Sequence, residues 1–279
     1  MADASPRRVF VFGAGKVGAG LARAIRDAGI EVTLRPKRRG LPQRPIDADL
    51  VIVALRDGDI PSCASELASR GLLARERGRV AVVHCAGALG PEALAAARSD
   101  RVAVAQMHPM ISFASKKRAP SLERGQLHVD GDAAATRVAR ALGRRLGMSP
   151  RTIVGLDRVA YHAAAGLVAN GAAALAAAGV DLLERAGVSR ETAAAMLGPL
   201  LRSVAENVEN LGLPDALTGP VRRGDANGIA KHLATLTRLA PQLVPLYVAA
   251  SRTQIPLARA LGEADPEAFD AIEARLSGL

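Results

Sequence analysis

Residues 8–20 read RVFVFGAGKVGAG, a short apolar run followed by glycines in the spacing GxGxxG. The apolar run predicts a buried β-strand, and the residues after the glycines predict a helix. In this setting Gly13 allows a tight turn, Gly15 lets the backbone approach a ligand, and Gly18 lets the helix pack closely on the strand. A helix N-terminus also offers free N–H groups to an anion. The stretch therefore predicts a turn that binds the pyrophosphate of a dinucleotide, made by Gly13, Ala14, Gly15, Lys16, Val17 and Gly18.

The first half of the chain alternates short β-branched runs with helical stretches. The expected strands are Val9–Phe12, Glu31–Arg35, Leu50–Leu55, Arg79–His84, Val102–Gln106 and Gln126–Asp130, with Arg151–Val154 as a further one. The expected helices are Lys16–Ala28, Ile60–Ser69, Pro91–Arg98 and Ala133–Leu146. This alternation predicts an α/β Rossmann domain over residues 1–155, with a mostly parallel, doubly wound sheet covered by helices on both faces.

The second half has a different pattern, because strand signals stop at Asp157 and long Ala- and Leu-rich segments follow. These segments predict an all-helical domain over residues 156–279, interrupted at 187–189, 212–214, 218–220 and 262. Ser189 is expected to cap a helix N-terminus. The nearly uncharged stretch Ala163–Val180 is long enough for a membrane helix, but Ala and Gly gain little from transfer into lipid. We therefore expect a helix buried against other protein.

The composition limits the partners. A formal net charge of +10 alone would suggest nucleic acid or an anionic membrane. However, only 5 of the 37 basic residues are lysines, the arginines are spread along the chain, and aromatic residues make up 2%. We expect neither nucleic acid nor a membrane as a partner. Cys63 and Cys85 cannot form a disulfide framework, and no secretory core precedes the first strand, so we expect a cytoplasmic protein.

The end of the second expected strand indicates which cofactor is bound. A carboxylate there, roughly 20 residues past the first glycine, binds the ribose 2′-OH of NAD. Here residues 34–39 read LRPKRR, with four cations and no carboxylate. This favours the 2′-phosphate of NADP, with Arg35 as its first contact and Lys37 or Arg38 in support. The alternative is a solvated basic loop.

Two more strand ends should line the nicotinamide half of the cofactor, because the carboxyl ends of parallel strands meet at one edge of the sheet. The residues expected there are Leu55, Arg56, Ala86 and Gly87.

These motifs resemble a Rossmann-like family that carries a domain of unknown function numbered 2520. The resemblance rests on GAGKVG, ALRDGDI, HCAGALG, HPMISF at 108–113 and LTGPVRRGD at 217–225. That family is in turn similar to ketopantoate reductase, pyrroline-5-carboxylate reductase and the 3-hydroxyisobutyrate dehydrogenases. The resemblance implies hydride transfer to or from a small anionic 2-oxo acid, ketopantoate-like, or an imino acid in an interdomain cleft. It also implies a homodimer built on the helical domains.

The sequence departs from those relatives where they carry a Lys-x-x-x-Asn pair on the first long helix of the second domain. Asn170 is a candidate catalytic residue by this resemblance, and aligning it with that asparagine places Gly166 at the lysine. His162 lies on the same helix face and is a candidate general acid, since an imidazole titrates near neutral pH. A rise of about 1.5 Å per residue separates His162 from Asn170 by roughly 12 Å. His162 could equally be a packing residue.

The helical domain offers further candidates. Lys231 is its only lysine and the remaining candidate for lysine-based catalysis. Arg222 and Arg223 could hold a substrate carboxylate in a bidentate way, beside Thr218. The alternative is that these cations are ordinary surface residues.

His108, after a predicted strand end, should face the substrate, with Ser112 following it, unless it is a structural histidine. His84 and His128 lie inside predicted strands and are interpreted as structural. The five histidines form no pattern of metal ligands with acids or cysteines, so we expect no metal.

Two other functions remain open. An NADP-binding sensor or interaction protein would keep the nucleotide site and lack the catalytic lysine. A nucleic-acid-binding protein would concentrate its cations on one face and bind with strong salt dependence.

Overall fold

The computed structural model describes residues 5–75 and 78–278. The chain divides into two compact units, Met1–Gly166 and Leu167–Leu279. The division falls inside one long helix, α4 (Arg158–Arg185), rather than in the loop before it. Each unit has a hydrophobic core of its own, so each is described by itself.

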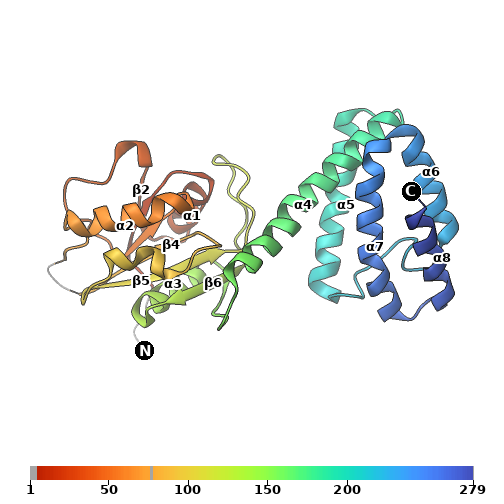
Figure 1. Cartoon of the computed structure of the whole chain (residues 1–279). Helices are drawn as coiled ribbons and strands as arrows, with labels where there is room; N and C mark the ends of the chain where they lie inside the picture. The colour runs from red at the N-terminus through yellow and green to blue at the C-terminus, as the bar shows by residue number, and fades with distance from the viewer. Residues whose placement is uncertain (1–4, 76–77, 279) are drawn as a thin grey trace. The chain divides into compact units, whose positions relative to one another are not determined.

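Among its described residues the first unit holds a seven-stranded sheet in the order β2–β1–β3–β4–β5–β6–β7 (Figure 1). The strands are β1 (Arg8–Phe12), β2 (Glu31–Arg35), β3 (Leu50–Val53), β4 (Val80–His84), β5 (Val102–Pro109), β6 (Gln126–Gly131) and β7 (Ser149–Arg151). Strands β2 to β5 are parallel to β1, whereas β6 runs antiparallel to β5. Because β1 has β2 on one side and β3 on the other, the order reverses there, at the crevice where such sheets bind ligands.

Helices cover both faces of this sheet. On β3, Val51 and Val53 point into one core and Leu50 and Ile52 into the other, as the alternation of a strand requires. All four are fully buried, which explains why the strand reads as one apolar run. The first core is closed by α2 (Ile60–Ser69) and the 3₁₀ segment η3 (Pro91–Ala97), the second by α1 (Lys16–Asp27) and α3 (Ala133–Arg145).

The second unit is helical, as predicted. After α4 come α5 (Arg190–Leu211), α6 (Ala226–Leu239), η4 (Pro241–Leu243), α7 (Val244–Leu261) and α8 (Pro266–Ser277). Its core lies among α6, α7 and α8, where Ile229, Ile255 and Phe269 are buried. The hydroxyl of Ser189 accepts a hydrogen bond from the N–H of Thr192 at 3.2 Å, which confirms the predicted cap.

The long helix α4 is not covered by its own chain. Its one buried residue is Val180, and α5 likewise buries only Ala193. By length and composition α4 could cross a membrane, with a mean hydropathy of 1.6 over its most apolar window and 6% of that window buried. Large apolar side chains on the two helices are exposed: Val159, Leu167, Val168, Leu175, Met196, Leu200, Leu201, Val204, Val208 and Leu211.

Four predicted elements differ from the structure in type or by more than one residue at an end. Strand β5 runs to Pro109, so His108 lies within it, because the antiparallel partner β6 pairs His108 with His128 and prolongs the ladder. Strand β3 ends at Val53, before the predicted Leu55. The last strand is Ser149–Arg151 rather than Arg151–Val154, and the predicted helix after β4 is the 3₁₀ segment η3.

Candidate functional site

The turn between β1 and α1 has the geometry that an anion site needs. Gly13 adopts φ +112°, and a Cβ built on it would lie 2.1 Å from the carbonyl oxygen of Ala54. A Cβ on Gly18 would lie 1.9 Å from the oxygen of Gly13, so helix and strand are in direct backbone contact. By contrast, a Cβ on Gly15 would meet nothing within 4 Å. The first and third glycines are therefore required by packing, and the second leaves open space above the turn.

The N-terminus of α1 is free to bind an anion. The N-cap residue is Gly15, so no side chain caps the first N–H groups of the helix, and the first turn contains no acidic residue. Unpaired N–H groups and the helix dipole both favour a phosphate there. Lys16, exposed at the first helical position, adds a positive charge.

In the basic loop after β2 the three cations predicted to bind the cofactor make different contacts. Arg35 donates from Nε to the carbonyl of Gly40 at 2.6 Å and from Nη2 to that of Arg39 at 2.8 Å, so it closes the loop on itself. Lys37 pairs with Asp59 at 2.7 Å. Arg38 is exposed, and its side chain has no hydrogen bond or ion pair among the described residues. Since the N–H of Gly13 donates to Arg35 O at 2.9 Å, this loop is joined to the glycine turn.

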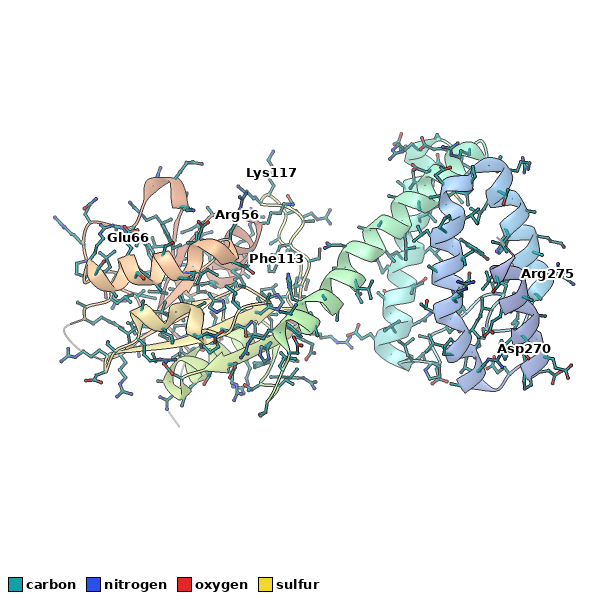
Figure 2. All side chains as sticks on the ribbon, viewed as in Figure 1. Arg56, Glu66, Phe113, Lys117, Asp270 and Arg275 are labelled. Carbon is teal, nitrogen blue, oxygen red and sulfur yellow. The ribbon has the colours of Figure 1, made fainter. Side chains whose placement is uncertain are left out.

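Leu55 and Arg56 follow β3 beside the same turn. A methyl carbon of Leu55 would lie 3.1 Å from a Cβ on Gly13, so this side chain forms one wall of the turn. Arg56 is exposed at the start of the 3₁₀ segment η2 (Asp57–Asp59), and Figure 2 labels it. Figure 2 also labels Phe113, whose ring carbon Cδ1 would lie 2.7 Å from a Cβ on Gly20 of α1.

The turn after β4 is held by buried polar side chains. His84 accepts from the N–H of Ala86 through Nδ1 at 3.2 Å, so its proton is on Nε2, which donates to Gly90 O at 2.8 Å. Gln106 on β5 donates to the carbonyls of Ala86 at 2.8 Å and of Gly87 at 3.3 Å. Burial lowers the pKa of His84, which keeps the imidazole neutral. The interpretation of His84 as structural is therefore supported.

Gln106 is itself oriented from the start of α4. Its Oε1 accepts a hydrogen bond from Nε of Arg158 at 3.2 Å, and Arg158 also forms an ion pair with Asp130. With one acceptor and both amide hydrogens engaged, Gln106 is fixed in one orientation. The chain of contacts runs from α4 through β5 to the turn that carries Ala86 and Gly87.

A cluster of aromatic and histidine side chains lies over Gly87. Nδ1 of His108 is 3.0 Å from the hydroxyl oxygen of Tyr161, and the ring centroids of His108 and His162 are 5.9 Å apart. A Cβ on Gly87 would lie 2.5 Å from Nδ1 of His162 and 2.9 Å from Nε2 of His108. These histidines thus converge on one backbone position, at the end of a central parallel strand.

Burial dominates the electrostatics of the cluster. Burial, and after it the imidazole of His162, lowers the pKa of His108 to about 4. Burial also lowers the pKa of His128, whose two ring nitrogens have no hydrogen-bond partner among the described residues. The pKa of Tyr161 is raised by burial. At neutral pH the inner part of the cluster is therefore uncharged.

The remaining predicted residues lie away from this cluster or in the other unit. Ser112 is exposed in the loop between β5 and β6. Asn170, Thr218, Arg223 and Lys231 belong to the second unit, where Asn170, Arg223 and Lys231 are exposed. Arg222 makes two hydrogen bonds to Glu263, at 2.7 and 2.6 Å, and two to the carbonyls of Asp215 and Leu217 at 3.0 and 2.6 Å. These contacts favour a structural role for Arg222.

No pattern of residues singles out Gln106, Arg158 or Tyr161 as members of the site. The first lies within a predicted strand and the second at the start of a helix, and their contact joins segments 52 residues apart. Tyr161 directly precedes the candidate His162, and no motif includes it. The pairing of β5 with β6 places His108 opposite His128, and no local pattern in the sequence indicates it.

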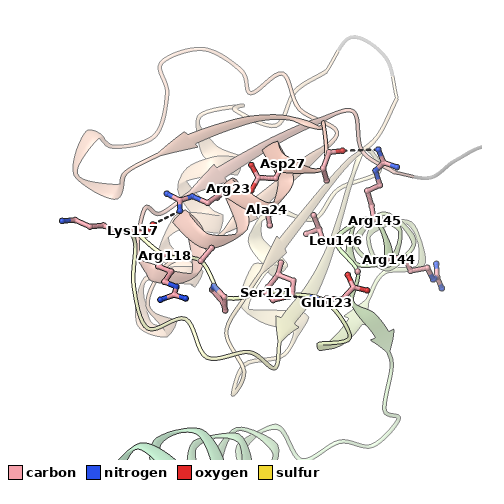
Figure 3. A pocket seen from close by; sticks show the side chains of 15 residues that line it. Arg23, Ala24, Asp27, Lys117, Arg118, Ser121, Glu123, Arg144, Arg145 and Leu146 are labelled. Carbon is pink, nitrogen blue, oxygen red and sulfur yellow. Dashed lines mark hydrogen bonds between the residues drawn. The ribbon is translucent and has the colours of Figure 1, made fainter. Parts of the chain in front are cut away.

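A separate cavity of about 630 Å³ lies between the C-terminal ends of α1 and α3 (Figure 3). None of the predicted site residues lines it, although it is rich in arginine and lysine. Arg23 donates to the carbonyl of Lys117 at 2.7 Å and Arg145 to that of Ala28 at 3.2 Å. In Figure 3 the side chains of Lys117 and Arg144 point away from one another. Cations near the C-terminus of a helix interact favourably with its last carbonyl groups, which gives the arginines of this cavity a structural role.

The described residues contain no group of histidine, cysteine, aspartate and glutamate that could hold a metal ion.

Part of the chain matches a known family. The model of the Domain of unknown function (DUF2520) matches residues 126–254, from β6 into α7. This match confirms the resemblance for that part of the chain. No curated protein is similar enough in sequence to count as a match.

Solved structures share the whole fold. A candidate NADP oxidoreductase from Bacteroides fragilis is 22% identical, with a TM-score of 0.67 over 91% of this chain and 100% of its own. A protein from Thermotoga maritima is 20% identical, with a TM-score of 0.64 over 90% and 98%. A pyrroline carboxylate reductase from Plasmodium falciparum, solved with NADP bound, is 14% identical, with a TM-score of 0.60 over 95% and 98%. The predicted fold, a Rossmann unit followed by a helical unit, is confirmed.

Proposed function

We propose that this chain, a Rossmann unit followed by a helical unit with a DUF2520 match over residues 126–254, is an NADP-dependent oxidoreductase that acts on a small anionic 2-oxo or imino acid. The observation that carries the proposal is the uncapped N-terminus of α1 with open space at Gly15, together with the histidines that gather past the end of β4, two strands away in the same sheet. One half of this site fits a dinucleotide and the other half offers proton-transfer groups.

The residues present fit a dinucleotide phosphate. Gly15 and the N–H groups that begin α1 would hold the pyrophosphate, with Lys16 beside it. Leu55 forms a wall of the same turn. Arg38, whose side chain is not engaged among the described residues, is the cation best placed to bind a 2′-phosphate, while Arg35 shapes the loop that carries it.

When bound, the nicotinamide supplies or accepts a hydride, and the protein then orients the groups and manages the proton. His162 is exposed beside Gly87 and can exchange its proton with solvent, so it is our candidate for general acid or base. Asn170 and Lys231, both on exposed helix positions of the second unit, are candidates for contact with the far end of the substrate, with Thr218 and Arg223.

The fold supports the proposed reaction class, an oxidoreductase, but does not indicate the substrate. Solved structures with this architecture include proteins described as reductases, one of them with NADP bound. Their names make pyrroline-5-carboxylate one of the small acids to test first.

The experiment is a calorimetric titration of the full chain with NADPH and NADH, followed by assays of NADPH oxidation with ketopantoate and with pyrroline-5-carboxylate. We expect NADPH to bind at least tenfold more tightly than NADH, and one acid to be turned over. Equal affinity for both nucleotides would contradict the choice of cofactor. Failure of both to bind would contradict the proposal as a whole.

A non-catalytic NADP sensor is the second candidate. The observation that favours it is Gly166, at the position where similar dehydrogenases carry a lysine. Tight NADPH binding without turnover of any small oxo or imino acid would favour the sensor.

We also propose a cytoplasmic homodimer built on the helical units. The exposed large apolar side chains of α4 and α5 support it, since large exposed apolar areas on soluble proteins are often interaction surfaces. The two unpaired cysteines fit a reducing compartment. A second copy of the chain would complete the burial that the sequence predicts for Ala163–Val180.

A further inference from the structure

Tyr161 is a member of the histidine cluster that the proposed reaction does not yet use. It is half-buried on the first turn of α4, and its hydroxyl lies 3.0 Å from Nδ1 of His108. The two rings meet edge to face, with centroids 5.4 Å apart and an interplanar angle of 78°. This contact joins α4 to the end of β5.

The chemistry of the two groups decides which of them donates. A phenol, with a pKa near 10, is a far stronger acid than a neutral imidazole N–H, and an unprotonated imidazole nitrogen is the better acceptor. Tyr161 therefore donates from Oη–H to Nδ1 of His108. With Nδ1 acting as acceptor, the single proton of the neutral ring is on Nε2.

That Nε2–H points toward Gly87. A Cβ at this position would lie 2.9 Å from Nε2 of His108 and 2.5 Å from Nδ1 of His162. The carbonyl of Gly87 is already bonded to Gln106 at 3.3 Å. Because residue 87 has no side chain, two imidazole nitrogens face the same position. Among the described residues of that turn, no carbonyl accepts a hydrogen bond from either of them.

The surroundings keep His108 uncharged. The ionisable groups that face it are His84 on β4, His128 on β6, and Tyr161 and His162 on α4. Asp130, two residues after His128 on β6, forms an ion pair with Arg158. No carboxylate is hydrogen-bonded or ion-paired with His108 in the described part of the chain. Burial therefore acts without an opposing charge, and the pKa of His108 falls to about 4.

We propose that His108 is a neutral hydrogen-bond donor to the carbonyl oxygen of a 2-oxo acid, and that Tyr161 is the positioning residue that fixes the Nε2–H tautomer. This inference rests on the proposed function and narrows its substrate class. As the carbonyl carbon is reduced, its oxygen gains negative charge and a fixed donor stabilises that charge. A protonated imine carries its own N–H and offers no lone pair to this donor, so the geometry selects the oxo acid. The carbonyl carbon would take the hydride that a bound nicotinamide supplies, and the oxygen would take its proton from His162, the general acid proposed above. His108 keeps its own proton, since losing it would leave an imidazolate.

The tautomer is tested first, without any assay of activity. Long-range ¹H–¹⁵N spectra of the labelled full chain, from about pH 6 to about pH 8, report which nitrogen of each histidine carries a proton. The five histidines are few enough to assign, and the His108→Asn variant identifies the signals of His108. We expect His108 to be neutral, with Nδ1 unprotonated. A charged ring or an Nδ1–H tautomer at pH 7 would overturn the proposal.

The chain supplies a matched control. Its other tyrosine, Tyr247, makes the same kind of contact with Nδ1 of His232, at 2.8 Å and with ring centroids 5.8 Å apart. Tyr161→Phe should shift the His108 signals toward a mixture of tautomers, whereas Tyr247→Phe should shift those of His232 and leave His108 unchanged. Unchanged His108 signals in Tyr161→Phe would remove Tyr161 from the positioning role.

Kinetics then test the substrate. With NADPH and ketopantoate, we expect His108→Asn to lower kcat by about 100-fold, as removal of one oxyanion donor does. Tyr161→Phe should lower kcat by about tenfold with KM within about twofold. His108→Gln, whose amide reaches the Nε2 position that the shorter asparagine amide does not reach, should recover part of the loss. Faster turnover of pyrroline-5-carboxylate than of any 2-oxo acid would overturn the choice of substrate class. No turnover of either acid, with the expected tautomer seen, would overturn the reductase and leave the Tyr161–His108 pairing established.

Discussion

At the scale of single residues, the structure separates cations that look alike in the sequence. Residues 34–39 contain four positive charges, and nothing in their order indicates which one is available to a ligand. Arg35 is engaged with the carbonyls of its own loop and Lys37 with Asp59, whereas Arg38 has no such partner among the described residues. Such local hydrogen bonds depend on the path of the loop, which a residue pattern does not contain.

Arg38→Ala should therefore lower the affinity for NADPH by about 10-fold to about 100-fold and leave NADH binding unchanged, since it removes one charge-assisted contact to a phosphate. Calorimetric titration of both nucleotides measures this. Arg35→Asp should also weaken NADPH binding by at least tenfold while sparing NADH. If Arg38→Ala binds NADPH normally and Arg35→Asp does not, the phosphate contact belongs to Arg35.

At the scale of elements, the join between β1 and α1 was predictable in full, because its glycines are required by contacts within one short stretch. A Cβ on Gly18 would lie 1.9 Å from a carbonyl oxygen, whereas one on Gly15 would meet only open space. Gly18 is thus required for the packing of the fold, whereas Gly15 leaves room for a ligand.

This separation gives a prediction for two alanine variants. Gly18→Ala should destabilise the protein by about 1–3 kcal/mol, because the methyl group forces helix and strand apart. Gly15→Ala should keep the melting temperature and lose nucleotide affinity. Thermal unfolding and NADPH titration of both variants measure the two effects. A normal melting temperature for Gly18→Ala would contradict the close contact.

The sheet and the helix positions could be predicted because they follow from local periodicity and from Gly and Pro. Strand β2 and helix α2 were predicted with the observed bounds. The end of β5 was not, since Met107–Pro109 are strand only through their pairing with β6, about twenty residues later. For the same reason the site was predicted in part: Gly87, His108 and His162 were identified individually, but Tyr161 and Gln106 act through contacts between distant segments.

At the scale of the whole molecule, two buried histidines and the half-buried His108 make the stability depend on pH. The pKa values of His84, His108 and His128 are all lowered by burial. The unfolded chain binds their protons below a pH of about 6.5, whereas the folded chain does not until a lower pH, about 4 for His108. Stability from this source is therefore complete above about pH 6.5 and is lost as the pH falls toward 4.

His128→Leu tests this dependence. Both ring nitrogens of His128 are buried without a partner among the described residues, so removing them should leave stability at pH 7 unchanged or raise it by about 1 kcal/mol. The loss of stability between pH 7 and pH 5 should become smaller. Urea unfolding at several pH values measures both, with His232→Gln, at an exposed histidine, as the control. A slope as steep as that of the natural protein would contradict the prediction.

The apolar surface of α4 and α5 also belongs to this scale. Leu200→Glu combined with Val204→Glu places two charges on one exposed face of α5 and should shift the protein from dimer to monomer. Light scattering coupled to size exclusion measures the mass. Thr237→Glu, exposed on α6, should leave the dimer intact. A natural protein that runs as a monomer would contradict the proposed assembly.

The two tyrosine–histidine pairs also make the protein its own spectroscopic probe. The chain contains no tryptophan and two tyrosines, so its native ultraviolet emission comes from Tyr161 and Tyr247 alone. Each hydroxyl is bonded to an imidazole nitrogen, which can draw the proton from the excited phenol and quench the light. Ligand binding over Gly87 can therefore be followed by the change in brightness of Tyr161, and the Tyr161→Phe variant gives the background from Tyr247.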